Sequence, residues 1–158
     1  MNKKEQEEQA INSFTILTDT REQLPYRYPN SKTQMLPYGD YTVAYYGKSY
    51  IDQIVVDRKG SISELYAFAG SERDRFCREL ERMQHVKFKY ILIEHTFMDI
   101  INKQKQGILP ASTVYSTIMS FMIKYGVTPL FFDNRQNARA ALYKIFSYFV
   151  KYEILGLK

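Results

Sequence analysis

The sequence predicts a single α/β domain in which a mixed central sheet is flanked by helices. A length of 158 residues suits one hydrophobic core. Apolar residues make up 45% of the chain and fall in periodic segments, which is too many for a disordered chain. Strand-like segments come close together early in the chain, and strands alternate with helical patterns later. Antiparallel pairs are therefore expected early in the chain and parallel pairs later.

The first twelve residues are polar and form either an arm or a frayed helix, so the domain itself is expected to cover residues 13–158. Residues 14–18 are rich in β-formers and predict a first strand that ends before Asp19. A loop with two prolines follows. Residues 41–46 and 50–56 predict a hairpin around Gly47-Lys48-Ser49.

The second half shows the alternation of helix and strand most clearly. Ser61 is suited to cap a helix, with Glu64 completing a capping box, and Gly70 ends that helix. Apolar spacings of three and four residues predict the later helices, and short continuous apolar runs predict buried strands. These elements are a helix at 72–83, a strand at 90–94, a helix at 114–125 that Gly126 ends, a strand at 130–132 and a helix at 137–152.

Bulk properties restrict the classes of function without selecting one. A formal charge of +5 and a pI near 9.2 fit a polyanionic partner. Cys77 is the only cysteine, so an intrachain disulfide is excluded and a reducing, intracellular setting is expected. No apolar run has the length of a membrane span, and the polar N-terminus has no signal-peptide core. We therefore expect a soluble, cytoplasmic protein with no membrane partner.

Carboxylates gather at predicted strand ends. Asp40 follows a glycine before one strand, while Asp57 and Lys59 form an Asp-x-Lys triplet at the end of another. Asp19 and Glu22 follow the first strand, where neighbouring sheet strands would bring them close to this pair. Clustered carboxylates repel one another unless a cation neutralises them. Mg²⁺ or Mn²⁺ is the cation that oxygen ligands of this kind hold, and metal-dependent phosphodiester cleavage is the chemistry that the pattern favours.

These motifs, in their order, resemble the nuclease domain of the XPF family of structure-specific DNA endonucleases. The family pattern is Gly-Asp, a spacer, Glu-Arg-Lys, three residues and Asp. The resemblance runs from about Phe14 through the last helix, and it implies the restriction-endonuclease-like fold of the PD-(D/E)xK superfamily. The segments that carry it are Asp19-x-Arg21-Glu22, Gly39-Asp40-Tyr41, Val56-Asp57-Arg58-Lys59 and Ser63-Glu64-Leu65.

The resemblance implies a role for each acidic position. Asp40 and Asp57 would bind the divalent metal, and Glu22 would be a further ligand or would orient water. Lys59 would be the catalytic lysine beside the attacking water, and Asp19 would support the metal site. Asp57 itself departs from the family pattern, which usually has Glu there.

The basic positions are expected to contact DNA. By the resemblance, Arg21 would support the scissile phosphate, Arg75 would reach the phosphate backbone, and Arg58 would either pair with a carboxylate or reach a phosphate. Arg73 begins the same arginine-rich helix as Arg75 and is expected to lie nearer the site than Arg78 and Arg82. An ordinary solvated helix face is the alternative, with neighbouring acids (Asp74, Glu79, Glu81) balancing the arginines.

A second departure lies behind the lysine, where Glu64 stands in place of the usual Asp. The wider superfamily accepts either carboxylate before x-Lys. A change of one methylene is small enough for a hard cation and its waters to absorb. Activity is therefore still expected.

The last helix carries an apolar face that is wider than one sheet contact requires. Simple burial is one interpretation. The resemblance implies the other, a homodimer through this region. The residues expected at that interface are Leu142, Ile145, Phe146 and Phe149.

The sequence thus favours a metal-dependent DNA endonuclease acting on branched DNA, such as flaps, forks or junctions, in recombination, repair or replication. Family members usually add a helix-hairpin-helix module or a helicase; neither fits behind the last helix, so a stand-alone nuclease is expected. Two alternatives stay open: a non-catalytic DNA-binding subunit of a nuclease complex, and an RNA-directed or general phosphodiesterase.

Overall fold

The computed structural model describes residues 1–102 and 109–158 and shows a mixed sheet with helices on both faces. Within these ranges the sheet has seven strands, in the order β2-β1-β3-β5-β6-β7, with β4 paired to the outer part of β3. The predicted fold class is confirmed. The strands are β1 (Phe14–Thr18), β2 (Ser31–Thr33), β3 (Tyr41–Tyr45), β4 (Lys48–Ser49), β5 (Ile54–Lys59), β6 (Phe88–Ile93) and β7 (Thr128–Phe131).

Strand directions agree with the sequence pattern. β1 and β5 both pair with β3 in antiparallel fashion, whereas β5, β6 and β7 are parallel to one another. The helices that join or follow them are α1 (Lys3–Ile11), α2 (Ile62–Ala69), α3 (Arg73–Arg82), α4 (Phe97–Asn102), α5 (Ala111–Tyr125) and α6 (Arg135–Phe149), which runs on as the π-helix η2 (Val150–Ile154).

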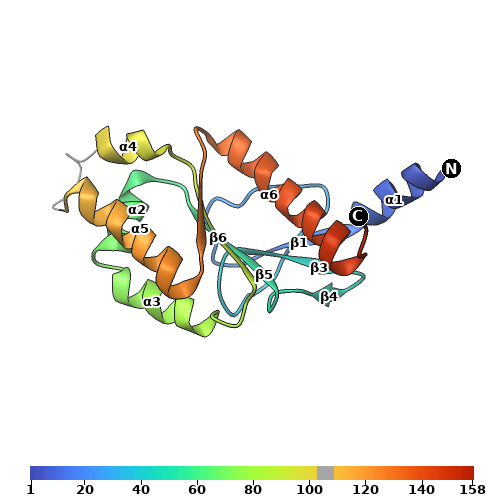
Figure 1. Cartoon of the computed structure of the whole chain (residues 1–158), viewed down its shortest axis with the longest axis horizontal. Coiled ribbons are helices and arrows are strands. Elements are labelled where there is room, and N and C mark those ends of the chain that lie inside the picture. Colours follow the sequence, from blue (N-terminus) through green and yellow to red (C-terminus); the bar gives the residue numbers. More distant parts are fainter. Residues whose placement is uncertain (103–108) are drawn as a thin grey trace.

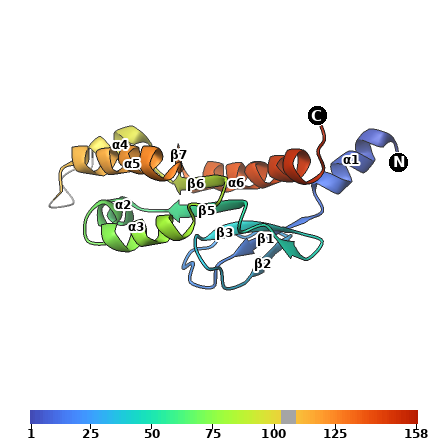
Figure 2. The same ribbon diagram turned by 60° about the horizontal axis from the view of Figure 1, so that its bottom comes forward.

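Two hydrophobic clusters lie on opposite faces of the sheet (Figures 1 and 2). Helices α2, α3 and α5 pack on one face, where Val55, Ile91 and Ile93 point. Helix α6 packs on the other face, against residues that include Val56 and Leu92. Because side chains alternate along a strand, consecutive residues of β5 serve different layers. This alternation decides which residues can share a site.

The N-terminal helix α1 projects away from the body of the molecule, and none of its residues is buried (Figures 1 and 2). Asn2 caps it: its side chain accepts from the backbone N–H of Glu5, while the Glu5 carboxylate accepts from that of Asn2. The Tyr45 hydroxyl donates to the carbonyl of Ala10 near its end. The polar segment is thus a helix with few tertiary contacts.

Several local predictions were wrong. Residues 31–33 form β2, which pairs in parallel with β1 although the sequence reads as a loop. The short helix α4 was not predicted. Residues 50–53 are not in a strand, since residues 51–53 form a turn, so β5 begins only at Ile54. β7 is a partly exposed edge strand and not a buried one, which suits Pro129, since an edge position tolerates a missing N–H donor.

The capping box before α2 is only half formed. Ser61 caps the helix by accepting from the backbone N–H of Glu64, as predicted. The Glu64 carboxylate accepts instead from Gly60, at 3.4 Å, and not from the backbone of Ser61. No helix among the described residues is long and apolar enough to cross a membrane.

Candidate active site

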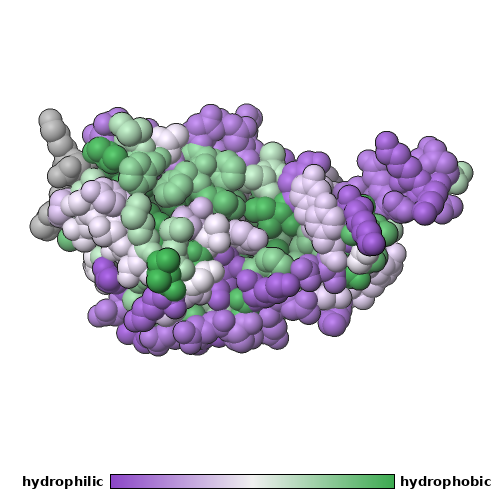
Figure 3. All heavy atoms as spheres, viewed as in Figure 1, coloured by the Kyte–Doolittle hydropathy of each residue, from purple (hydrophilic) through white to green (hydrophobic). Residues whose placement is uncertain are grey.

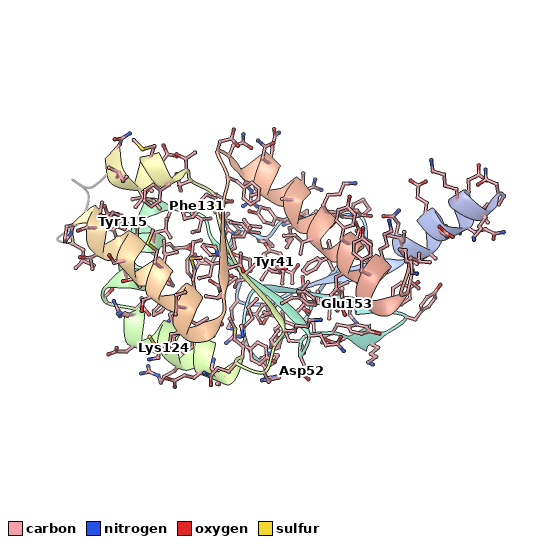
Figure 4. All side chains as sticks on the ribbon, in the orientation of Figure 1. Tyr41, Asp52, Tyr115, Lys124, Phe131 and Glu153 are labelled. Carbon is pink, nitrogen blue, oxygen red and sulfur yellow. The ribbon has the colours of Figure 1, made fainter. Side chains whose placement is uncertain are left out.

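A cleft of about 610 Å³ opens between the ends of β1, β3 and β5 and the helices α2 and α3. Its walls include the acidic positions that the sequence assigned to the candidate metal site, together with the predicted lysine. The lining residues that matter here are Asp19, Arg21, Glu22, Asp40, Asp57, Arg58, Lys59, Glu64, Arg75, Arg78, Glu79 and Arg82. Tyr41, the residue after Asp40, lies at the centre of the molecule (Figure 4).

Strand β5 presents the Asp-x-Lys triplet to the cleft. Asp57 and Lys59 share the face of Val55, toward α2 and α3, and Lys59 Nζ lies 2.7 Å from Asp57 Oδ2. Both groups are largely shielded from water, so the contact is a buried ion pair. The Lys59 ammonium also lies over the ring of Phe76, 4.7 Å from its centroid. The lysine is thus fixed by one carboxylate below the cleft and one aromatic ring beside it.

Asp40 reaches the same place from the start of β3. The backbone N–H of Asp40 donates to the carbonyl of Val56, and its Oδ2 accepts from the backbone N–H of Arg58 at 2.7 Å. The preceding Gly39 has φ +69°, and a Cβ there would lie 2.2 Å from Val55 Cγ2. Only glycine fits this turn, which explains the Gly-Asp pair physically.

The carboxylates of Asp40 and Asp57 are buried close enough to repel one another. Burial, followed by repulsion from the carboxylates of Asp57 and Glu22, raises the pKa of Asp40 well above its ordinary value. Burial alone would lower the pKa of Lys59, but the carboxylates of Asp57 and Asp40 outweigh it and leave that pKa raised. Negative charge therefore exceeds what Lys59 neutralises.

Arg58 lies on the opposite face of β5 and is buried with only 4% of its side chain exposed. Its guanidinium donates to both oxygens of Glu22, at 3.0 and 3.1 Å, and to Glu94 at 2.8 Å. Arg135, near the start of α6, approaches the same Glu94 oxygen at 3.5 Å. Of the two roles expected for Arg58, pairing with carboxylates is the one that the structure shows.

Asp19 supports the loops around the cleft. Its side chain is 2% exposed and accepts from the Arg21 guanidinium and from the backbone N–H of Leu36. Although burial by itself raises the pKa of Asp19, the hydrogen bonds from Arg21 and Leu36 outweigh it and leave the pKa lowered. Asp19 thus holds the loop that carries Arg21, and the Arg21 side chain is 67% exposed at the cleft.

The arginines of α3 that line the cleft are not the same set as the two that were predicted. Arg75 lines the cleft, where it is 75% exposed and pairs with Glu72. Arg73 turns away: it donates to Thr117 Oγ1 at 2.9 Å and lies over the ring of Phe121 on α5. Arg78 and Arg82 line the cleft in its place. A helix rotates its residues by about 100° per position, so Arg73 and Arg75 cannot share a face.

The residues expected at a dimer interface lie inside the chain. Leu142 and Phe146 are fully buried and Phe149 is 5% exposed, all within the cluster between α6 and the sheet. Ile145 is partly buried beside them. The wide apolar face of α6 is therefore explained by burial, because the helix also packs against the loop tyrosines Tyr26 and Tyr28.

Two acidic residues of the site were not predicted. Glu94 follows a buried apolar strand parallel to β5, a position that brings it to the same sheet edge as the triplet. Glu79 lies one helical turn after Arg75, and its Oε1 accepts from the backbone N–H of Gly39 at 2.7 Å. The position of Glu94 at a strand end and the helical spacing of Glu79 from Arg75 are the sequence signals that could identify them.

The donor set fits a hard divalent cation. The Asp40 and Asp57 carboxylates both line the cleft, and burial with repulsion from Asp57 raises the pKa of Asp40, so a cation between the two would stabilise their ionised forms. In the part of the chain that the structure describes, no three His, Cys, Asp or Glu side chains converge as a metal cage. Mg²⁺ is commonly held by one or two carboxylates with waters and substrate phosphates, so two protein ligands are sufficient. Glu22 is less free to bind, since both its oxygens accept from Arg58.

Comparison with known structures defines the class of fold. The chain is similar to "XPF from Aeropyrum pernix", with a TM-score of 0.62, 18% identity, and coverage of 84% of this chain and 65% of that one. It is also similar to "XPF from Aeropyrum pernix, complex with DNA", with a TM-score of 0.59, 17% identity, and coverage of 85% and 63%. The chain therefore spans less than two thirds of the length of these proteins.

The family follows from the sequence. Residues 4–145 match the family described as the ERCC4 domain. The chain belongs to that family, and the resemblance to the XPF nuclease domain is confirmed. A search of curated proteins found no match. One spacing differs from the family pattern: four residues, not three, separate Lys59 from the acidic Glu64.

Proposed function

We propose that this chain is a divalent-metal-dependent DNA endonuclease that hydrolyses phosphodiester bonds, in branched DNA in particular. The observation that carries the proposal is the buried Asp57–Lys59 pair, with Asp40 beside it, at the floor of a cleft rimmed by arginines. Membership of the ERCC4 domain family supports it, as does the similarity to a protein whose structure was solved with DNA.

Asp40 and Asp57 would hold Mg²⁺ or Mn²⁺. When bound, such an ion lowers the pKa of a bound water and stabilises charge on the phosphoryl oxygens. Lys59 would stand next to the attacking water, because its ammonium is anchored to Asp57 and faces the cleft. Arg58 would keep the Glu22 carboxylate in place from below, and Asp19 would keep Arg21 at the cleft edge for the scissile phosphate.

Arg75, Arg78 and Arg82 would contact the DNA backbone. Guanidinium forks match phosphate oxygens, and all three side chains line the cleft. Arg21 would add a further contact on the opposite wall. Repair, recombination or replication of DNA is the process in which branched substrates arise, and an intracellular location is part of the proposal.

The decisive experiment compares labelled flap, fork, four-way junction, linear duplex and RNA substrates in Mg²⁺, Mn²⁺ or EDTA. Asp57→Ala and Lys59→Ala should abolish cleavage. Asp74→Asn and Lys124→Ala are matched controls outside the cleft and should cleave normally. Cleavage that persists in EDTA or in both site variants would sink the proposal. DNA binding without cleavage in either metal would favour a non-catalytic subunit, and preferential cleavage of RNA would favour a general phosphodiesterase.

We also propose a homodimer, as the family resemblance implies, but with different contact residues. Hydrophobic residues gather on the face that shows α5, β7 and α6 (Figure 3). Tyr148 and Tyr152 are each 51% exposed, and their rings stack at 5.8 Å. Exposed aromatic side chains of this kind are enriched at interfaces. A monomeric mass in light scattering at micromolar concentration would count against a dimer; Tyr148→Ala with Tyr152→Ala should weaken one.

A further inference from the structure

Glu79 connects helix α3 to the turn that carries Asp40. Its side chain is half-buried in the wall of the cleft, and its Oε1 accepts from the backbone N–H of Gly39 at 2.7 Å. A hydrogen bond to a carboxylate is stronger than one between neutral groups. Arg75 and Arg78 on the same helix differ from Glu79, because both are exposed at the cleft and Arg75 pairs with Glu72.

The hydrogen bond from Gly39 to Glu79 anchors the turn that carries Asp40. Gly39 adopts φ +69° where a Cβ would clash with Val55, and the next residue, Asp40, is tied to β5 by two hydrogen bonds. Those bonds fix Asp40 along the sheet. The bond to Glu79 fixes the preceding peptide from the helix side, so the Asp40 carboxylate keeps its place beside Asp57.

Glu79 also adds charge to the site. Burial, followed by repulsion from Asp57, raises the pKa of Glu79, while Lys59 and Arg82 oppose that effect. When Asp40, Asp57 and Glu79 are ionised, Lys59 neutralises only one of the three charges. Arg58 does not supply the balance, because it is already paired with Glu22 and Glu94. Arg82 at the cleft offsets part of the Glu79 charge, and a cation between Asp40 and Asp57 would offset more of the remaining negative charge.

We propose that Glu79 is a positioning residue of the candidate metal site: it holds the Gly39 peptide so that Asp40 faces Asp57, and its charge strengthens cation binding. The inference rests on the proposed function, because the candidate metal site is part of it. Its test measures cation binding and does not require cleavage. Glu79 need not coordinate the ion itself, in keeping with the absence of a three-residue cage among the described residues.

The test titrates Mn²⁺ into the whole chain by calorimetry. Glu79→Gln keeps an oxygen that accepts from Gly39 but removes the charge, so the fold should be retained, with an unchanged melting temperature in EDTA. Its Kd for Mn²⁺ should rise about tenfold, the usual effect of removing an outer partner of a metal site. Glu79→Ala loses both contributions and should bind more weakly still.

Glu81→Gln, on the exposed side of the same helix, is the matched control and should bind Mn²⁺ as the wild type does. Wild-type affinity in Glu79→Gln would overturn the inference. If the wild-type chain binds no Mn²⁺ at all, the inference and the proposed function fail together. If it binds Mn²⁺ more tightly than Glu79→Gln but cleaves no substrate, only the proposed function fails.

Discussion

Lys59 Nζ lies 2.7 Å from Asp57 Oδ2 on one face of β5, while Arg58 between them faces the other side of the sheet. The period of two along a strand thus separates the triplet into an ion pair that faces the cleft and an arginine that pairs with carboxylates on the other side. Both members of the pair are largely shielded from water, with 15% of the Lys59 side chain and 6% of that of Asp57 exposed. Each compensates the charge of the other.

Removal of the ammonium alone should therefore be costly. Lys59→Met leaves Asp57 without its partner, and breaking a buried ion pair from one side costs about 3–5 kcal/mol of unfolding free energy. Asp57→Asn combined with Lys59→Met should recover most of that loss. Urea denaturation in EDTA measures both. A double variant no more stable than Lys59→Met would show that the pair is not coupled.

Arg58 should matter for stability and not for DNA contact. Arg58→Lys keeps the charge but cannot donate to both Glu22 oxygens and to Glu94, so we expect a loss of about 1–3 kcal/mol. The control Arg78→Lys, at the exposed rim, should be nearly neutral. Thermal denaturation gives the comparison. Equal stability of the two variants would argue against the buried network.

DNA affinity should depend on the arginines at the cleft in a salt-dependent way. Replacement of Arg75 by Ala should reduce the slope of log K against log salt by about 1, because one phosphate contact is lost. Arg73→Ala should leave the slope unchanged, since that side chain bonds to Thr117 away from the cleft. Fluorescence anisotropy from 50 to 200 mM salt measures both slopes. A larger effect from Arg73 than from Arg75 would place the DNA path elsewhere.

A feature of this fold could be predicted from the sequence where a local residue pattern encodes it, and not where it depends on tertiary neighbours. Apolar periodicity located the central strands and the long helices, and the strand-end acids were correctly grouped because parallel and antiparallel neighbours bring their ends together. The strand β2 was not predicted because its three residues are polar and exposed, and the strand is defined by its pairing with β1. The pairing of Arg58 and the burial of Leu142 and Phe146 depend on which neighbouring element covers each face, and no local pattern encodes that. Helical spacing does separate Arg73 from Arg75, but the contact of Arg73 with Thr117 depends on the fold.

Glu79 shows the same limit within the site. The spacing of Glu79 from Arg75 places both residues on a helix. The role of Glu79, however, depends on a hydrogen bond that it accepts from the backbone N–H of Gly39, which is distant in the sequence. Motif reasoning found the residues that carry the family signature. The residues that hold those in place, Glu79 and Glu94, became visible only with the fold.

Gly39 should be sensitive to any side chain. Gly39→Ala combines a left-handed backbone, worth about 1–2 kcal/mol, with a methyl group pressed against Val55, worth about 1–3 kcal/mol more. Gly47→Ala is the control: its φ is +81°, but nothing lies within 4 Å of the added Cβ, so only the first cost applies. Chemical denaturation separates the two. Equal losses would mean that Val55 yields easily; partial rescue by Val55→Ala would confirm the clash.

The central claim is a divalent cation held between Asp40 and Asp57 beside Lys59. Crystals of the chain soaked in Mn²⁺, with diffraction data collected at the manganese absorption edge, test it most directly. The account predicts an anomalous peak about 2 Å from oxygens of both carboxylates, with the remaining positions taken by water. A well-occupied peak that touches neither Asp40 nor Asp57, or no peak in the cleft at saturating Mn²⁺, would contradict it.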